Sequence, residues 1–87
     1  MKAQIIARTY TLTSTFAPIV TLAAGVSLAC SGVLVFTGTS GAGYILSDDG
    51  STAVPLTAGI PYPFSNIDLT TLQVKGSGSV EFIGSSY

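Results

Sequence analysis

A run of 39 residues without a charged side chain, from Thr9 to Ser47, limits the folds open to this chain more than any other feature. Its middle part, residues 17–36, is apolar enough and long enough to cross a bilayer as a helix. The same window contains a proline and two glycines, and Val26, Leu28 and Cys30 alternate with small or polar residues. That period of two is typical of a strand, and no Lys/Arg cluster flanks the window. The pattern favours β-structure, with a membrane span over residues 17–36 as the alternative.

Residues that favour helices on a protein surface are scarce in this chain. Ser and Thr occur eleven times each and Gly ten times, whereas Glu occurs once and Lys twice. Short β-prone runs are separated by turn residues at the close spacing typical of small sandwiches and barrels. We therefore predict an all-β fold, which is a small antiparallel β-sandwich, a jelly-roll-like fold or a barrel. Residues 1–16 form an extended N-terminal strand or arm, and residues 17–87 form a single small β domain.

Three stretches are predicted to reverse the chain direction. Residues 48–51 (Asp-Asp-Gly-Ser) favour a tight hairpin turn, and two adjacent carboxylates cannot encircle a calcium ion. Residues 38–43 (GTSGAG) lack the Lys-Ser/Thr of a phosphate loop and are predicted to be a hairpin tip. A closing hairpin is expected to join residues 69–75 to residues 80–84. Two further strands, Val26 to Cys30 and Val33 to Thr37, are expected on either side of Ser31-Gly32.

The candidate contact residues lie in two segments that read as exposed strands. Residues 3–13 alternate, with Ile6, Arg8, Tyr10 and Leu12 on one face and Ile5, Ala7, Thr9 and Thr11 on the other. Two prolines flank Tyr62, and their missing N–H groups confine that segment to a sheet edge or a connector. Tyr62 and Phe64 are expected to point the same way, either into the chain's own core or into an intersubunit contact. The candidate interface residues are Ile5, Ile6, Tyr10, Leu12, Tyr62 and Phe64.

The inventory of reactive side chains is very small. The chain has three basic residues, four acidic residues, one Cys, no His and no Trp. We predict that it is not an enzyme, because general acid/base work would depend on four carboxylates, most of them in turns. No cofactor or metal is expected, and Cys30 is interpreted as a small buried apolar residue. A net charge of −1 gives no attraction to nucleic acid.

Association with other subunits is expected from the size of the chain. A domain of this mass buries only about 60% of the surface of its extended chain, which leaves it marginally stable. One Cys cannot close an intrachain disulfide, and the absence of His leaves no ordinary zinc site. Contacts with copies of itself or with a scaffold are the remaining source of stability.

The second half of the chain has a recognisable pattern from Gly43 to Gly84. An aliphatic strand precedes an Ala-Gly turn, aromatic residues follow, and Leu-x-Val and Val-x-Phe strands close the segment. The residues concerned are Ala58, Gly59, Tyr62, Phe64, Asp68, Leu69, Leu72, Val74, Lys75, Gly76, Val80 and Phe82. This segment resembles the C-terminal part of small β-structured virion proteins of tailed bacteriophages, including capsid decoration (cement) proteins.

The resemblance implies a structural protein of the virion, without catalytic residues. It implies a homo-oligomer, with a trimer favoured, that binds the major capsid protein or another virion protein and stabilises the shell. A connector or tail component is an alternative position in the particle, and a small membrane-associated protein is the alternative of another class.

Overall fold

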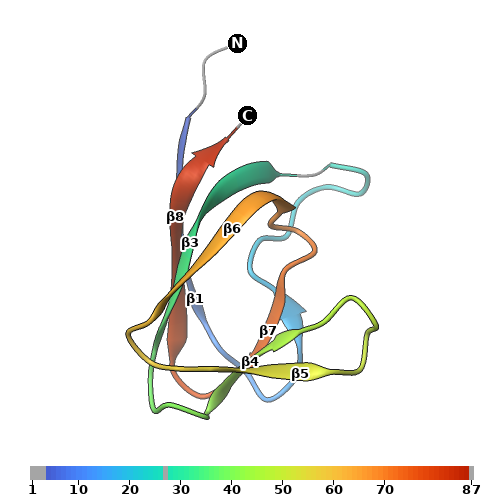
Figure 1. Cartoon of the computed structure of the whole chain (residues 1–87). Coiled ribbons are helices and arrows are strands. Elements are labelled where there is room, and N and C mark those ends of the chain that lie inside the picture. Colours follow the sequence, from blue (N-terminus) through green and yellow to red (C-terminus); the bar gives the residue numbers. More distant parts are fainter. Residues whose placement is uncertain (1–3, 27, 87) are drawn as a thin grey trace.

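The computed structural model describes residues 4–26 and 28–86, and these residues form eight β-strands without a helix. The strands are β1 (Ile5–Thr11), β2 (Ala17–Pro18), β3 (Ala29–Thr37), β4 (Gly43–Leu46), β5 (Ala53–Leu56), β6 (Pro61–Asp68), β7 (Gln73–Gly76) and β8 (Ser79–Ser86). They make two four-stranded antiparallel sheets (Figure 1). Sheet A has the order β1-β8-β3-β6, and sheet B has the order β2-β7-β4-β5. The predicted all-β fold is confirmed, in the form of a small sandwich.

The core lies between the two sheets and is built from alternate residues of their strands. Strands β3 and β8 direct Leu34, Phe36, Val80 and Phe82 inward, and all four side chains are at most 2% exposed. Sheet B and its flanking loops add Leu56, Leu69, Leu72 and Val74. Cys30 is fully buried among these apolar side chains, as predicted, and this burial raises the pKa of its thiol. The Cys30 thiol is therefore a packing group.

The glycine-rich segment at residues 38–43 is a crossover between sheets, which corrects the predicted hairpin tip. The strands on either side, β3 and β4, belong to different sheets and do not pair. The ring of Phe36 fills the space that the missing side chains leave: a Cβ atom at Gly38 would lie 2.7 Å from its Cζ, and one at Gly43 would lie 2.8 Å from its Cε1. The glycines serve the packing of one aromatic ring.

The predicted closing hairpin is also wrong, because β7 lies in sheet B and β8 lies in sheet A. Each strand is already paired on both sides, β7 with β2 and β4, and β8 with β1 and β3. Gly76 and Gly78, with φ angles of 136° and 108°, turn the chain from one sheet to the other. The Gly76 N–H donates to the Thr13 carbonyl at 2.8 Å and ties this crossover to the end of β1.

Residues 17–36 are arranged differently from both sequence interpretations. They hold β2, a loop and most of β3, and among the residues described no helix is long and apolar enough to cross a membrane. Of the two strands expected on either side of Ser31-Gly32, the first (Val26 to Cys30) is strand only from Ala29, since Val26 and Leu28 lie in the preceding loop and Ser27 is outside the described residues. The second continues from it without a break in β3, with a register irregularity between Cys30 and Gly32 on the β6 side. The close packing of β3 between β8 and β6 keeps this strand extended through the glycine.

The β4–β5 hairpin confirms the predicted turn at residues 48–51. The Ser47 N–H donates to the Thr52 carbonyl at 2.9 Å, and Gly50 adopts a φ of 76°. Asp49 Oδ1 accepts the N–H groups of Ser51 and Thr52 at 2.8 Å each, and its Oδ2 accepts the Thr52 hydroxyl. These hydrogen bonds, above all the one from the Thr52 hydroxyl, lower the pKa of Asp49 from 3.8 to about 2.

Acidification is expected to remove the stabilisation that Asp49 provides. Because its pKa is lower in the folded chain than in the unfolded chain, the contribution is present above pH 3.8 and is lost as the pH falls from 3.8 towards about 2. We expect Asp49→Asn to unfold at a lower urea concentration than the wild type at pH 5, and this difference to shrink towards pH 2. Asp48→Asn keeps the Asp49 hydrogen bonds and is the control. A difference between wild type and Asp49→Asn that does not change with pH would contradict the assignment.

Candidate interaction surface

The four outer edges of the two sheets are not equivalent. These edges are the strands β1 and β6 in sheet A, and β2 and β5 in sheet B. All four prolines of the chain lie in three of these strands, Pro18 in β2, Pro55 in β5, and Pro61 and Pro63 in β6. Strand β1 has seven residues and no proline. Among the edges formed by residues 4–26 and 28–86, it is the one whose backbone donors are complete.

The hydrogen-bond pattern shows that the prolines of β6 face away from the sheet. In an antiparallel ladder each residue directs its N–H and C=O either towards one neighbouring strand or away from it. The Phe36 carbonyl accepts the Gly59 N–H on the β6 side at 3.0 Å, so the preceding residue, Val35, directs its groups towards β8. Pro61 lies opposite Val35, and Pro63 stands two residues further along. Their nitrogens occupy positions where an added strand would need donors.

The same alternation applies to the two edges of sheet B. Ile19 donates its N–H to the carbonyl of the residue before β7 at 3.1 Å, which turns the nitrogen of the preceding Pro18 outward. In the β4–β5 hairpin, the Ser47 N–H donates to the Thr52 carbonyl, so Thr52 directs its backbone groups towards β4. Pro55 stands three residues further along, and its nitrogen is therefore directed towards the free edge of β5. Each of these three edges therefore lacks a donor that an incoming strand would use.

The free edge of β1 has its hydrogen-bonding groups intact. The Leu12 N–H donates to the Gly78 carbonyl at 2.9 Å, and the Gln4 carbonyl accepts the Ser86 N–H at 2.8 Å. The even-numbered residues of β1 therefore bond to β8, and the odd-numbered residues face away from it. These outward residues are Ile5, Ala7, Thr9 and Thr11. Their N–H and C=O groups form a ready template for another extended chain.

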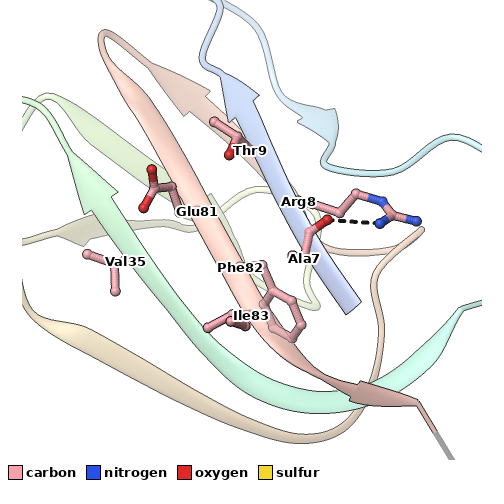
Figure 2. Close-up of a pocket in the computed structure, with 7 residues that line it drawn as sticks. All are labelled: Ala7, Arg8, Thr9, Val35, Glu81, Phe82 and Ile83. Atoms are coloured by element: carbon pink, nitrogen blue, oxygen red, sulfur yellow. Dashed lines mark hydrogen bonds between the residues drawn. The ribbon is translucent and has the colours of Figure 1, made fainter. Parts of the chain in front are cut away.

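Arg8 lies at the middle of this edge. Its side chain reaches past the free side of β1, and Nη1 donates to the Ala7 carbonyl at 2.9 Å (Figure 2). That carbonyl is one of the outward-facing acceptors of the edge. An arginine that covers a backbone acceptor on an edge strand hinders indiscriminate strand addition.

The outer face of sheet A beside this edge carries a row of apolar residues next to a mixed row. One row across the sheet consists of Ala7, Ile83, Val33 and Pro63, and the next consists of Thr9, Glu81, Val35 and Pro61. Ile83 is 57% exposed, and Ile5 at the end of β1 is 80% exposed. A shallow hollow of about 300 Å³ crosses β1, β8 and β3 between these rows (Figure 2). Exposed aliphatic residues that lie together on a sheet face are typical of a contact surface.

On the corresponding face of sheet B, two aromatic side chains are engaged by a lysine. The Lys75 ammonium lies 4.9 Å from the centre of the Phe16 ring and 5.8 Å from that of Tyr44. These cation–π contacts connect a loop residue to β7 and β4 across the sheet. Sheet A is therefore the better candidate for an intermolecular contact.

Four of the six predicted interface residues lie in β1 or directly after it, and their side chains are on opposite faces of sheet A. Ile5 is on the outer face beside the free edge, whereas Ile6 and Leu12 are buried in the chain's own core, at 7% and 6% exposure. Tyr10 is half-buried on the same inner side. The side chains of Ile6 and Leu12 are therefore not available to a partner. The alternation predicted for residues 3–13 is confirmed from Ile5 to Leu12, and Ala3 lies outside the described residues.

Tyr62 and Phe64 lie in β6, at the other edge of sheet A. Both are half-buried against the core and line an open hollow of about 290 Å³ between β6 and β5, together with Val54 and Leu56. The Tyr62 hydroxyl accepts the Thr57 N–H at 2.7 Å, so its polar atom is engaged by the backbone. These two side chains close the side of the sandwich and pack against the chain's own core.

The residues that sequence analysis missed are the outward-facing positions Ala7, Thr9 and Thr11, and the aliphatic rows of sheet A. The signal for the open edge was the placement of the four prolines, but it is readable only once the strand order is known. Asp68 is also structural, since its Oδ1 accepts the N–H groups of Leu28 and Thr70. Within residues 4–26 and 28–86, no group of three His, Cys, Asp or Glu side chains is arranged to hold a metal ion.

Comparison of the chain with protein-family models, with curated proteins and with solved structures finds no match. The assignment of a function therefore depends on the geometry of the β1 edge and sheet A, and on the resemblance of the segment from Gly43 to Gly84.

Proposed function

We propose that this chain is a structural virion protein that binds a capsid shell and stabilises it as an oligomeric decoration component. The observation that supports this proposal is the open sheet edge of β1, the one such edge among residues 4–26 and 28–86, next to exposed aliphatic residues of the outer face. The resemblance of residues 43–84 to small virion proteins supports a virus particle as the assembly that the chain joins. The partner is the major capsid protein or another virion protein, and a connector or tail position is the alternative within the same particle.

The physical reason is that open edges and apolar faces are unfavourable unless something covers them. Free strands invite aggregation, and folded proteins usually blunt them, as this chain does at its three proline-containing edges. An edge left open beside exposed aliphatic residues suits a protein that is completed by its neighbours in an assembly. Binding of this kind needs no catalytic group. Because the chain has a net charge of −1, we expect the attachment to depend little on salt.

Cosedimentation with purified shells that lack the chain tests this function. We expect the wild-type chain to saturate the shells and to raise the temperature at which they disassemble. We expect Ile83→Asp to bind about tenfold more weakly or worse, because a carboxylate would be desolvated at an apolar contact. Leu22→Asp makes the same change at an exposed loop residue and is the control. A wild-type chain that stays in the supernatant at every shell concentration would overturn the proposal.

A further inference from the structure

The distribution of prolines limits how two copies of this chain can share a sheet. Strand addition needs free donors and acceptors on both partners. The outward-facing prolines remove donors from β2, β5 and β6, so β1 of one copy finds a complete edge only on β1 of another. Pairing of β1 with β1 is isologous and closes after two copies. Rings and filaments, which require two different edges to meet, are disfavoured.

When two β1 strands pair antiparallel, a two-fold axis passes through the residue that lies opposite its own copy. The outward-facing residues can bond to one another when that central residue is Ala7, Arg8 or Thr9. Centring on Arg8 sets two guanidinium groups directly opposite, in a non-hydrogen-bonded pair with Cα atoms about 4.5 Å apart, and like charges in that position are destabilising. Centring on Ala7 sets Arg8 opposite Ile6, which offers it no favourable contact. Both arrangements leave the charge of Arg8 without a complementary partner.

Centring on Thr9 gives complementary pairs. Arg8 then lies opposite Tyr10 of the second copy, whose half-buried ring can accept the guanidinium in a cation–π contact. On the outer face, Thr9 lies opposite Thr9, and Ala7 lies opposite Thr11. The outward-facing groups of Ala7, Thr9 and Thr11 would exchange roughly six backbone hydrogen bonds.

In this pairing the Arg8 side chain would change its contact from its own backbone to the second copy. In the single chain its Nη1 covers the Ala7 carbonyl, which is the acceptor that the Thr11 N–H of the second copy requires. Movement of the guanidinium onto the opposite Tyr10 ring would free that carbonyl. Arg8 would thus cover the edge in the monomer and contact the partner in the dimer.

We infer that β1 pairs with β1 of a second copy about a two-fold axis at Thr9, so that two A sheets form one continuous eight-stranded sheet. The inference rests on the proposed function for the expectation of an oligomer, and it specifies the symmetry of that oligomer. A trimer would have to be built on other contacts, such as the outer faces of sheet A. A contact of this length lies at the small end of specific interfaces, so we expect dissociation in the micromolar range.

Sedimentation of the intact chain over a range of concentrations, without any shell, tests the pairing. Thr9→Pro removes an outward-facing N–H that does not bond to β8, and Thr9→Val keeps that N–H with a similar shape. We expect a monomer–dimer equilibrium for the wild type, a dissociation constant within about twofold of it for Thr9→Val, and at least a tenfold weaker dimer for Thr9→Pro. A wild-type chain that remains monomeric at millimolar concentration, or that forms trimers, would overturn the inference.

Cysteine cross-linking tests the register and does not depend on the folding of the proline variant. Thr9→Cys is expected to form a disulfide-linked dimer on mild oxidation, because the two Cα atoms would lie about 5.5 Å apart. Ala7→Cys is the matched control, since the two residues at position 7 would be offset by four residues, about 13 Å along the strand. The wild type, whose one thiol is the buried Cys30, gives the background. Equal cross-linking at positions 7 and 9, or none at position 9, would overturn the proposed axis.

These outcomes separate the inference from the proposed function. A monomeric chain that still saturates shells would overturn the β1–β1 pairing and leave the virion role standing. A dimer that ignores shells would overturn the virion role and support the pairing.

Discussion

Replacing Phe36 with alanine is expected to destabilise the fold by about 3–5 kcal/mol, the range for deleting a buried aromatic ring. Phe36 is fully buried, and its ring fits the space left by Gly38 and Gly43 where the chain crosses between the sheets. Domains of this length unfold with a free energy of about 4–13 kcal/mol, so the variant should lose much of its stability. Urea unfolding followed by circular dichroism measures the difference.

The matched control for this substitution is Phe64→Ala. It removes the same atoms from a half-buried position at the open side of the sandwich. Since less apolar surface is buried there, we expect a loss of about 1–2 kcal/mol. If Phe64→Ala proved as damaging as Phe36→Ala, the core would be centred elsewhere than the β3–β8 layer.

Gly84→Ala is expected to cost about 3 kcal/mol or more, at the upper end for overpacking, because the added methyl group meets backbone atoms. Gly84 of β8 lies opposite Gly32 of β3 in the middle of sheet A. A Cβ atom at Gly84 would lie 2.7 Å from the Gly32 Cα and would overlap the Ser31 carbonyl oxygen. Neither neighbour can rotate away as a side chain could, so the two strands would have to separate.

Gly41→Ala separates this steric effect from the general cost of losing a glycine. Gly41 has a φ of 85°, and a Cβ atom there would have no neighbour within 4 Å. The expected cost is about 1–2 kcal/mol, which is the strain of an L residue in the left-handed region. Thermal unfolding of the two variants side by side measures both values. A Gly84→Ala chain as stable as Gly41→Ala would contradict the close approach of β3 and β8.

Several features of the fold could be predicted because they depend on neighbours in the sequence. The Asp-Gly turn at residues 48–51 follows from the positive φ that Gly50 permits and from the hydrogen-bonding of Asp49. The alternation from Ile5 to Leu12 follows from the two-residue period of a strand. The edge position of the segment around Tyr62 follows from the two prolines beside it, which have no N–H to donate.

The errors all concern partners that are distant in the sequence. Residues 69–75 and 80–84 look like a hairpin because a short glycine-containing segment joins them, yet each strand finds its neighbours elsewhere. Residues 38–43 look like a loop tip because glycine suits loops, yet two of these glycines make room for Phe36. The predicted interface combined residues that the fold assigns to the core, such as Ile6, with others at opposite edges of one sheet.

By itself, the sequence determined that this chain forms short strands, where its Asp-Gly turn lies, and which reactive side chains are scarce in it, since these properties depend on local backbone preference and on the residues present. The tertiary structure alone decided which strands pair, and therefore which edge is left open and which aliphatic residues share an exposed face. The physical reason is that a strand can bond to any other strand of suitable length, so the choice depends on how all the apolar faces are buried together. The effect of the four prolines depends on which strands pair, because a missing N–H donor is harmless at a sheet edge and damaging within a sheet.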